Sequence, residues 1–469
     1  MLFDSPIFFV FLILVVVGYW RLKFRAQNIF LLLASYFFYG WWDWRFLLLM
    51  IGSTTVDYFI AHAIGRAPDD FRRKRLLILS LVINFGILGI FKYFNFFIGS
   101  FSHLVSTIGF AHLPVSFLKI ILPPGISFYT FQEVAYIVDV YNRKIEPADS
   151  FIDYALFISL FPHLIAGPIQ RPDHLLPQVQ KHRFWDGEKA LDGMLLIAEG
   201  LFRKCVIADN CALIANAAFG GKFGPPNLPV LLLGTYAFAW QIYGDFSGYS
   251  DIARGCAQIL GFHFMVNFRQ PYFAQNLQDF WRRWHISLST WLRDYLYIRI
   301  GGNRKGEART YSNLLTTMLL GGLWHGANWT FVIWGGIHGA GLAFERLIGI
   351  TKERLSNRMA LIWLRRILVF HLVCFSWIFF RAESVSAAWQ MIGGLAHWNW
   401  QPSYWAAAKF LTVFSLPLFI LDLSLEATGD EYLFQSRPHF QRVGVALTSI
   451  LAIVLFGANQ ANAFIYFQF

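Results

Sequence analysis

The chain has 469 residues, of which 56% are apolar, 19% aromatic and only 14% charged, and its mean hydropathy is +0.47. A soluble globular chain has about a quarter of its residues charged, so this composition excludes an ordinary soluble domain and indicates an integral membrane protein. The net charge of +11 does not indicate nucleic-acid binding, because the basic residues form short clusters between apolar segments, as in the loops of membrane proteins.

A membrane-spanning helix needs about 20 apolar residues, and many segments approach this length. The clearest are residues 6–20, 28–48, 76–98, 191–215, 228–243, 312–348, 361–380, 407–425 and 443–458. Three further segments would have to bury polar residues or a proline inside a helix bundle. They are 46–64 with Asp57, 126–141 with Glu133 and Asp139, and 151–166 with Pro162. We predict an all-α membrane domain over residues 1–469, with about ten to thirteen spans or half-spans.

The first apolar segment is predicted to be a span. It lacks the basic stretch and the small-residue cleavage site of a signal peptide. Clusters of basic residues then occur in alternate loops between the predicted spans. They follow the first span, residue 64 and residue 141. Because positively charged loops stay in the cytoplasm, we expect the N-terminus to lie outside it.

Two polar segments interrupt the apolar pattern before residue 262. Residues 161–172, FPHLIAGPIQRP, place three prolines and a glycine around His163 and predict a broken helix or a re-entrant turn. In residues 241–255, Asp245 and Asp251 could coordinate a cation, but the spacing matches no calcium loop. Helix capping and an ion pair with Arg254 explain these two acids more simply.

Four cysteines occur in apolar or helical context, and no CxxC pair is present. They are Cys205, Cys211, Cys256 and Cys374. We predict buried thiols that act as small apolar residues, rather than disulfides or metal ligands.

Residues 262–309 are too polar to span and rich in aromatic residues, which predicts backbone at the membrane interface or lining a wet cavity. Asn276, with Asp279 three residues later, predicts the start of a helix. That helix is predicted to continue through DFWRRWHISLSTWLRDYL. Its aromatic stripe consists of Phe280, Trp284, Leu288, Trp291 and Tyr295.

His285 lies off this stripe, on a predicted mixed polar face with Trp281 and Arg282. A basic interfacial helix at the membrane surface is the alternative interpretation. If the segment re-enters the bundle, however, His285 and His325 could face one cavity.

His325 stands in LLGGLWHGANWTFVIWGGIHG, within an apolar segment and beside three glycines. A titratable imidazole at membrane depth indicates function, because a polar group there costs free energy unless it has a partner. The glycines permit close approach of a ligand or of another backbone. The alternative is a core histidine bonded to a carbonyl of a neighbouring helix, which is the interpretation we prefer for His338.

Residues beside the two histidines are candidates for substrate binding: Asn328, Trp324, Trp281 and Asp294. Asn328 is expected on the same helix face as His325, where it could orient the ring or bind a carbonyl. The chain has no phosphate-binding glycine loop with lysine, no GxSxG and no HExxH. Nucleotide hydrolysis and metal-dependent proteolysis are therefore unsupported.

The chain resembles the membrane-bound O-acyltransferase family in four segments, FPHLIAGPIQR, QIYGDFSGYSDIA, NFRQPYFAQNLQDFWRRWHISLSTWLRDYLYIRIGGNR and GGLWHGANWTFVIWGGIHG. The resemblance is strongest to the bacterial branch that includes the membrane subunit of alginate O-acetyltransferase, and it extends to the ending FIYFQF. It implies a multi-helix fold with re-entrant and interfacial helices around a central funnel or tunnel. It also implies that His325 is the catalytic histidine and His285 a second functional histidine.

The resemblance implies that His325 acts as general base on an acceptor hydroxyl, which attacks an acyl thioester. His285 or Asn328 would bind or polarise the donor, and the tunnel would exclude water. The donor would be acetyl-CoA or another cytoplasmic thioester, with no bound cofactor and no metal.

The same resemblance implies a place in the bacterial cytoplasmic (inner) membrane. The expected partners are extracytoplasmic hydrolase-like acetyltransferase subunits and the polysaccharide synthesis and secretion machinery. The acceptor would be an exported polymer such as alginate or cellulose. Two alternatives remain: D-alanyl transfer from a carrier protein to teichoic acid, and a non-catalytic polysaccharide or lipid transporter with broken helices.

Overall fold

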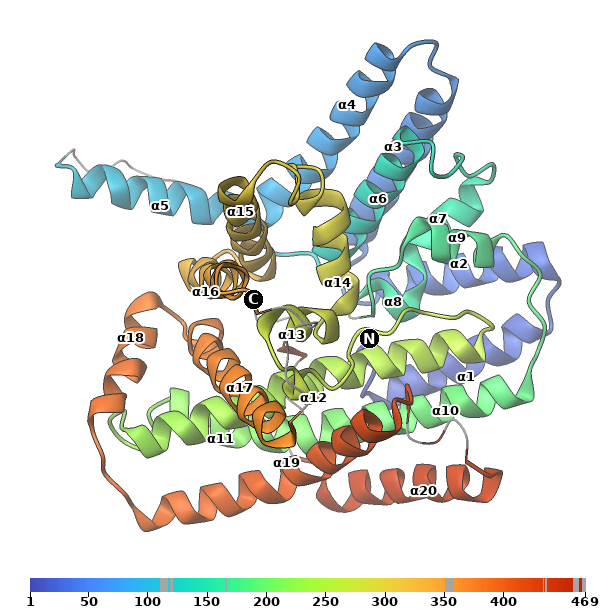
Figure 1. The fold of residues 1–469 in the computed structure, drawn as a ribbon. Coiled ribbons are helices and arrows are strands. Elements are labelled where there is room, and N and C mark those ends of the chain that lie inside the picture. Colours follow the sequence, from blue (N-terminus) through green and yellow to red (C-terminus); the bar gives the residue numbers. More distant parts are fainter. Residues whose placement is uncertain are drawn as a thin grey trace. The chain divides into compact units, whose positions relative to one another are not determined.

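The computed structural model describes residues 1–109, 117–118, 121–165, 167–350, 358–432, 434, 437–458 and 464–465. These residues form helices and no strand, which confirms the all-α prediction for this part of the chain (Figure 1). Two compact units are present: residues 1–190 with 256–264, and residues 191–255 with 265–469. We call them the first and the second unit.

The first unit contains nine α-helices and one π-helical turn in its described part. They are α1 (Pro6–Trp20), α2 (Phe24–Gly40), α3 (Trp44–Arg66), α4 (Asp70–Leu88), η1 (Gly89–Tyr93), α5 (Phe94–Thr107), α6 (Ile126–Tyr141), α7 (Phe151–Ser159), α8 (Phe161–Leu164) and α9 (Pro172–Val179). Helices α3, α4 and α6 pack against one another, and α2 packs against α7.

The second unit contains the remaining helices, although its boundaries fall inside α10 and α12. They are α10 (Gly187–Leu201), η2 (Phe202–Ala208), α11 (Asp209–Phe219), α12 (Leu228–Ile259), η3 (Pro271–Phe273), α13 (Leu277–Arg283), α14 (Ile286–Trp291), η4 (Leu292–Tyr297), α15 (Glu307–His325), α16 (Trp329–Leu347), α17 (Met359–Arg381), α18 (Val385–Gly393), η6 (Gly394–Ala396), α19 (Pro402–Thr428) and α20 (His439–Phe456). Helices α15 and α16 form an extensively packed hairpin.

Five stretches of described helix are long and apolar enough to cross a membrane. They are Trp44–Arg66, Asp70–Thr107, Met359–Arg381, Pro402–Thr428 and His439–Phe456. The protein is thus a membrane protein, and the count of ten to thirteen spans or half-spans stays a prediction. Several of the predicted apolar segments are divided: residues 28–48 at the turn between α2 and α3, and residues 312–348 between α15 and α16.

Asp57 and Glu133 of the first unit are buried, as predicted, and they take hydroxyl and amide partners. The Asp57 carboxylate on α3 accepts hydrogen bonds from Ser80 and Asn84 on α4, at 2.6 and 2.7 Å. The Glu133 carboxylate on α6 accepts from Ser53 and Thr54 on α3, at 3.0 and 2.9 Å. A buried polar group needs such partners, because its lost hydration is otherwise uncompensated. These bonds join α3 to both of its neighbours.

The segment around His163 is broken, as predicted. Helix α7 ends at Ser159, and α8 begins at Phe161 with Pro162 in its first turn. A proline is accepted in a first turn because the amide it removes has no partner inside the helix there. The His163 Nε2 atom lies 3.1 Å from the carbonyl oxygen of Phe157, which makes this histidine part of the packing of the break.

Candidate functional site: two histidines in the second unit

His325 is the last residue of α15, and the chain turns immediately after it into α16. The two helices approach closely because glycines face each other: a Cβ atom on Gly322 would lie 2.2 Å from the Phe331 carbonyl oxygen and 3.2 Å from Gly335 Cα. The glycines before His325 were predicted to admit a ligand or another backbone. At Gly322 the structure shows the second of these, a neighbouring helix.

Aromatic rings surround His325, which is only 3% exposed. The centroid of its ring lies 5.0 Å from that of Trp334, 5.1 Å from that of Trp324 and 5.2 Å from that of Phe380. These rings come from α15, α16 and α17. The imidazole therefore sits in an apolar enclosure, where an electrostatic or proton-transfer step is little screened by water.

His285 stands at a break between two short helices. Helix α13 ends at Arg283, α14 begins at Ile286, and His285 adopts a left-handed backbone with φ of 43°. The prediction of one continuous helix from residue 279 to 296 is therefore wrong. The predicted face shared with Trp281 and Arg282 does not exist either, since the helix axis changes at this residue. The predicted start is confirmed, because the Asn276 side chain accepts from the Asp279 amide at 2.6 Å.

The two histidines lie side by side, with ring centroids 6.4 Å apart. Trp324 contacts both, at 5.9 Å from His285 and 5.1 Å from His325. His285 is fully buried, and Phe246 of α12 packs edge-on against it at 4.6 Å. Of the two interpretations of this segment, re-entry into the protein interior agrees with this geometry, whereas exposure at the membrane surface does not. The wider funnel or tunnel stays a prediction.

Burial sets the protonation state of His285, which lies outside the five candidate spans. Desolvation lowers the pKa of His285 from 6.5 to about 3, because a charged imidazole is poorly stabilised in an apolar environment. The ring is therefore neutral near pH 7. A neutral imidazole has one nitrogen that can accept a proton or a hydrogen bond.

Asn328 does not share a helix face with His325, which corrects the geometric prediction for this candidate. Gly326 is extended, and Asn328 is the N-cap of α16. Its side-chain oxygen accepts from the Thr330 amide at 3.1 Å, and its Nδ2 donates to the Glu383 carbonyl at 3.0 Å. These bonds stabilise the turn after His325, so the side chain is engaged in holding that turn.

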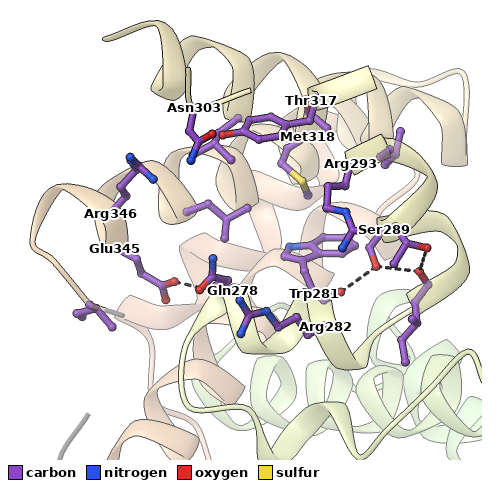
Figure 2. A pocket seen from close by; sticks show the side chains of 17 residues that line it. Gln278, Trp281, Arg282, Ser289, Arg293, Asn303, Thr317, Met318, Glu345 and Arg346 are labelled. Atoms are coloured by element: carbon purple, nitrogen blue, oxygen red, sulfur yellow. Dashed lines mark hydrogen bonds between the residues drawn. The ribbon is translucent and has the colours of Figure 1, made fainter. Parts of the chain in front are cut away.

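A cavity of about 480 Å³ lies between α13, α14 and η4 on one side and α15 and α16 on the other (Figure 2). Neither histidine lines it. Trp281 does, and its ring lies 5.8 Å from that of Trp334, which in turn contacts His325. Met318 also lines the cavity, and it stands two helical turns before His325 on α15. The cavity therefore borders the aromatic enclosure of His325.

The cavity wall carries three arginines and one acid: Arg282, Arg293, Arg346 and Glu345. Glu345 accepts from the backbone amides of Leu277 and Gln278, at 2.6 and 3.3 Å, and so caps α13. Arg293 pairs with Asp294, and Arg346 with Glu307. Arg282 is exposed and forms no ion pair with any residue that the structure describes. Arg282 is thus the one of these three arginines without an acidic partner among the described residues, and it suits an anionic ligand.

Of the four substrate-binding candidates, Trp281 lines the cavity and Trp324 contacts both histidines. Asp294 is next to the cavity through its pair with Arg293, whose Nε lies 2.7 Å from the Asp294 carboxylate. The structure thus brings three candidates near the histidines or the cavity. The role of each in binding stays a prediction.

The other candidate residues are structural. His338 bonds to the Ser376 hydroxyl at 2.9 Å, which fits the packing interpretation. Asp251 pairs with Arg254 at 3.3 Å, as predicted, and Asp245 pairs with Lys204 at 2.9 Å. The four cysteines form no disulfide, and three of them are buried. Within the described ranges, no group of three or more His, Cys, Asp or Glu side chains could hold a metal ion.

The sequence did not predict the aromatic rings around His325 or the asparagine beside His285. The rings of Trp334 and Phe380 enclose His325, and the Asn267 side chain lies against His285. Asn267 opens the third resembling segment, NFRQPYF, but its distance in sequence from His285 left its role unrecognised.

Comparisons with known proteins agree with this geometry. Residues 148–351 match the model of the membrane-bound O-acyltransferase family. The chain is 44% identical to the probable alginate O-acetylase of Pseudomonas aeruginosa over 86% of this chain and 76% of that protein. It is 39% identical to the probable alginate O-acetylase of Pseudomonas putida over 100% of both chains. It is also 36% identical to the peptidoglycan O-acetyltransferase of Helicobacter pylori, over 85% of this chain and 80% of that protein.

Proposed function

Because this acyltransferase belongs to the membrane-bound O-acyltransferase family, we propose that it passes acetyl groups from a cytoplasmic thioester across the bacterial cytoplasmic membrane for O-acetylation of an exported polysaccharide. The observation that carries the proposal is the buried pair of His285 and His325, with ring centroids 6.4 Å apart. The names of the relatives support an acetyl group and a carbohydrate polymer as acceptor. Alginate and cellulose are the polymers we expect first.

In the proposed reaction, the His325 imidazole takes the proton of the acceptor hydroxyl while the hydroxyl oxygen attacks the thioester carbonyl carbon. The new C–O bond forms, the C–S bond breaks, and the imidazolium returns its proton to the leaving thiolate. No proton is gained or lost overall. The aromatic enclosure of His325 limits the access of water, which would otherwise hydrolyse the thioester.

The cavity of Figure 2 suits the anionic end of the donor. A donor such as acetyl-CoA carries phosphates, and arginine guanidinium groups bind phosphate oxygens in a fixed planar geometry. Arg282 is the side chain best placed for this, because no acid among the described residues pairs with it. The acyl end would then extend past Trp281 toward Trp334 and His325, along the contacts between these rings.

The proposed donor and acceptor sides require a definite orientation. We propose that the N-terminus lies outside the cytoplasm, following the basic loop clusters. Extracytoplasmic hydrolase-like acetyltransferase subunits would receive the acyl group and complete the transfer, together with the synthesis and secretion machinery of the polymer.

The test compares His325→Ala with His338→Gln, since both change a buried histidine of the second unit. We expect His325→Ala to remove acetate from the secreted polysaccharide and to stop thiol release from acetyl-CoA by the purified protein. His338→Gln should retain both activities. Wild-type acetylation in His325→Ala at a normal protein level would contradict the proposal. D-alanine transfer from a carrier protein, or transport without covalent acyl transfer, would support one of the two alternatives instead.

A further inference from the structure

Asn267 lies between α12 and η3 and is 1% exposed. Its side-chain oxygen Oδ1 accepts from the backbone amide of Ser287 at 3.2 Å and from the Ser287 hydroxyl at 2.9 Å. The same oxygen lies 3.1 Å from His285 Nδ1. The Asn267 Nδ2 donates to the Ser250 hydroxyl at 3.2 Å. One buried amide thus connects α12 to His285 and to the start of α14.

These partners determine which way the Asn267 amide points. A backbone N–H can only donate, so the atom facing the Ser287 amide must be the oxygen. An amide oxygen can only accept, so the bond to His285 requires a proton on Nδ1. The second ring nitrogen of a neutral histidine then carries the lone pair, because the hydrogen bond at one nitrogen sets the protonation of the other.

The backbone supports the same arrangement. His285 adopts φ of 43°, a left-handed conformation that is uncommon for a residue with a side chain. The Asn267 carbonyl oxygen accepts from the Ile286 amide at 2.9 Å, immediately after His285. Asn267 therefore holds the ring through its side chain and the backbone through its carbonyl. Such a conformation persists where surrounding contacts enforce it.

We infer that Asn267 is a positioning residue that keeps His285 in the Nδ1–H tautomer and so presents Nε2 as a hydrogen-bond acceptor. This inference rests on the proposed acyl transfer. It also revises the expected role of His285, since polarising a thioester carbonyl requires an N–H that neutral Nε2 lacks. His285 instead accepts a hydrogen bond from a second, non-reacting hydroxyl of the acceptor, which leaves the single proton of the reacting hydroxyl to His325. This bond orients the acceptor beside His325.

The first part of the test determines the tautomer of His285 directly and does not depend on an activity assay. Full-length protein with 15N-labelled histidine is measured by NMR, and the His285 signals are identified by their loss in His285→Gln. We expect a protonated Nδ1 and an unprotonated Nε2 in the wild type, and a change in this pattern in Asn267→Ala. A wild-type His285 protonated at Nε2 alone would overturn the inference, whatever the protein catalyses.

The second part uses kinetics in membranes that retain the partner subunits and the exported polymer, with acetyl-CoA as the donor and thiol release as the readout. Asn267→Ala should lower kcat about 10- to 100-fold at every pH, since oriented partners of this kind are worth roughly that factor. Asn267→Asp keeps the shape of the side chain and the oxygen that accepts the hydrogen bond from His285. Its negative charge, however, raises the pKa of His285. The charged ring then donates at Nε2 near pH 7, so the activity of Asn267→Asp should be low there and recover as the pH rises.

The matched control is Ser376→Ala, which removes a buried bond to another histidine, His338. It should lose comparable thermal stability but keep wild-type kcat and pH dependence. If Asn267→Ala fails to fold, the pH-dependent recovery of Asn267→Asp still decides the question. Wild-type kinetics in both Asn267 variants would overturn the inference, whereas a wild-type protein that transfers no acyl group would overturn the proposed function instead.

Discussion

His285 and His325 face each other at a ring-centroid distance of 6.4 Å, with Trp324 in contact with both. One ring follows a helix break, and the other ends a helix that belongs to a tight hairpin. Two groups this close can act on one bound acceptor, which makes their contributions to the rate interdependent.

The first expectation concerns this interdependence. His325→Ala should lower kcat by about 10²- to 10⁴-fold, the range of a lost general base. His285→Gln should also slow the reaction, and the double variant should be about as slow as the slower single variant. The measurement is kcat for thiol release, with protein abundance checked in each preparation. Losses that multiply in the double variant would show that the two histidines act in separate steps.

A second expectation follows from Arg282 in the wall of the cavity. Arg282→Gln should raise KM for acetyl-CoA about tenfold, since a hydrogen bond to a charged group contributes roughly 1.5–3 kcal/mol, and kcat should stay within about twofold. Arg304→Gln is the matched control, because it removes the same charge at an exposed site outside the cavity. Equal effects of the two substitutions would point to general electrostatics rather than to binding in the cavity.

The α15–α16 hairpin provides a third expectation. A Cβ on Gly322 would lie 2.2 Å from the Phe331 carbonyl oxygen, so Gly322→Ala must separate the two helices. Overpacking of this kind costs about 1–3 kcal/mol, and it should also displace His325 and reduce acyl transfer. Gly336→Ala is the control, since its Cβ would meet only Leu319 Cδ2 at 3.5 Å. Thermal unfolding and kcat are measured for both, and equal melting temperatures would contradict the role of Gly322.

The fourth expectation concerns acid stability. Burial lowers the pKa of His163, His285 and His338 to about 3, from an ordinary value of 6.5. Below pH 6.5 the unfolded chain therefore binds more protons than the folded protein. The free energy of unfolding decreases as the pH falls from 6.5 towards 3. Each histidine contributes up to about 1.4 kcal/mol per pH unit.

His338→Gln tests this directly, because His338 lies outside the proposed reaction. Melting temperatures are compared at pH 7.5 and pH 5 in the same detergent. The drop should be smaller in the variant than in the wild type. An unchanged drop would show that His338 is not forced to remain neutral in the folded protein.

The membrane class, the helical fold and the acyltransferase family could all be predicted from the sequence, and the functional roles of His325 and His285 stay predictions. The composition indicates that the chain folds in a lipid bilayer, because it has too few charged residues to cover a water-exposed surface. Local patterns were reliable where a single contact decides the outcome. The Asn276 cap at the start of α13 and the break near Pro162 are examples.

Periodicity was unreliable where distant contacts decide the backbone. The stripe from Phe280 to Tyr295 predicted one helix, yet the chain breaks at His285, where Asn267 bonds to the residues that follow. Asn328 likewise satisfied a three-residue spacing from His325, but α15 ends before that spacing can apply. A helical spacing has meaning only while the helix continues.

A helical membrane protein is predicted by hydropathy alone, because hydropathy depends only on the residues of each segment. The acyltransferase pattern around the two histidines is predicted by the resemblance of short segments to a family, and each such segment is local in the chain. The proximity of His285 and His325, the arginines of the neighbouring cavity and the bond from Asn267 to His285 became visible only in the folded protein. Each of them depends on side chains from different segments, whose packing no local spacing encodes.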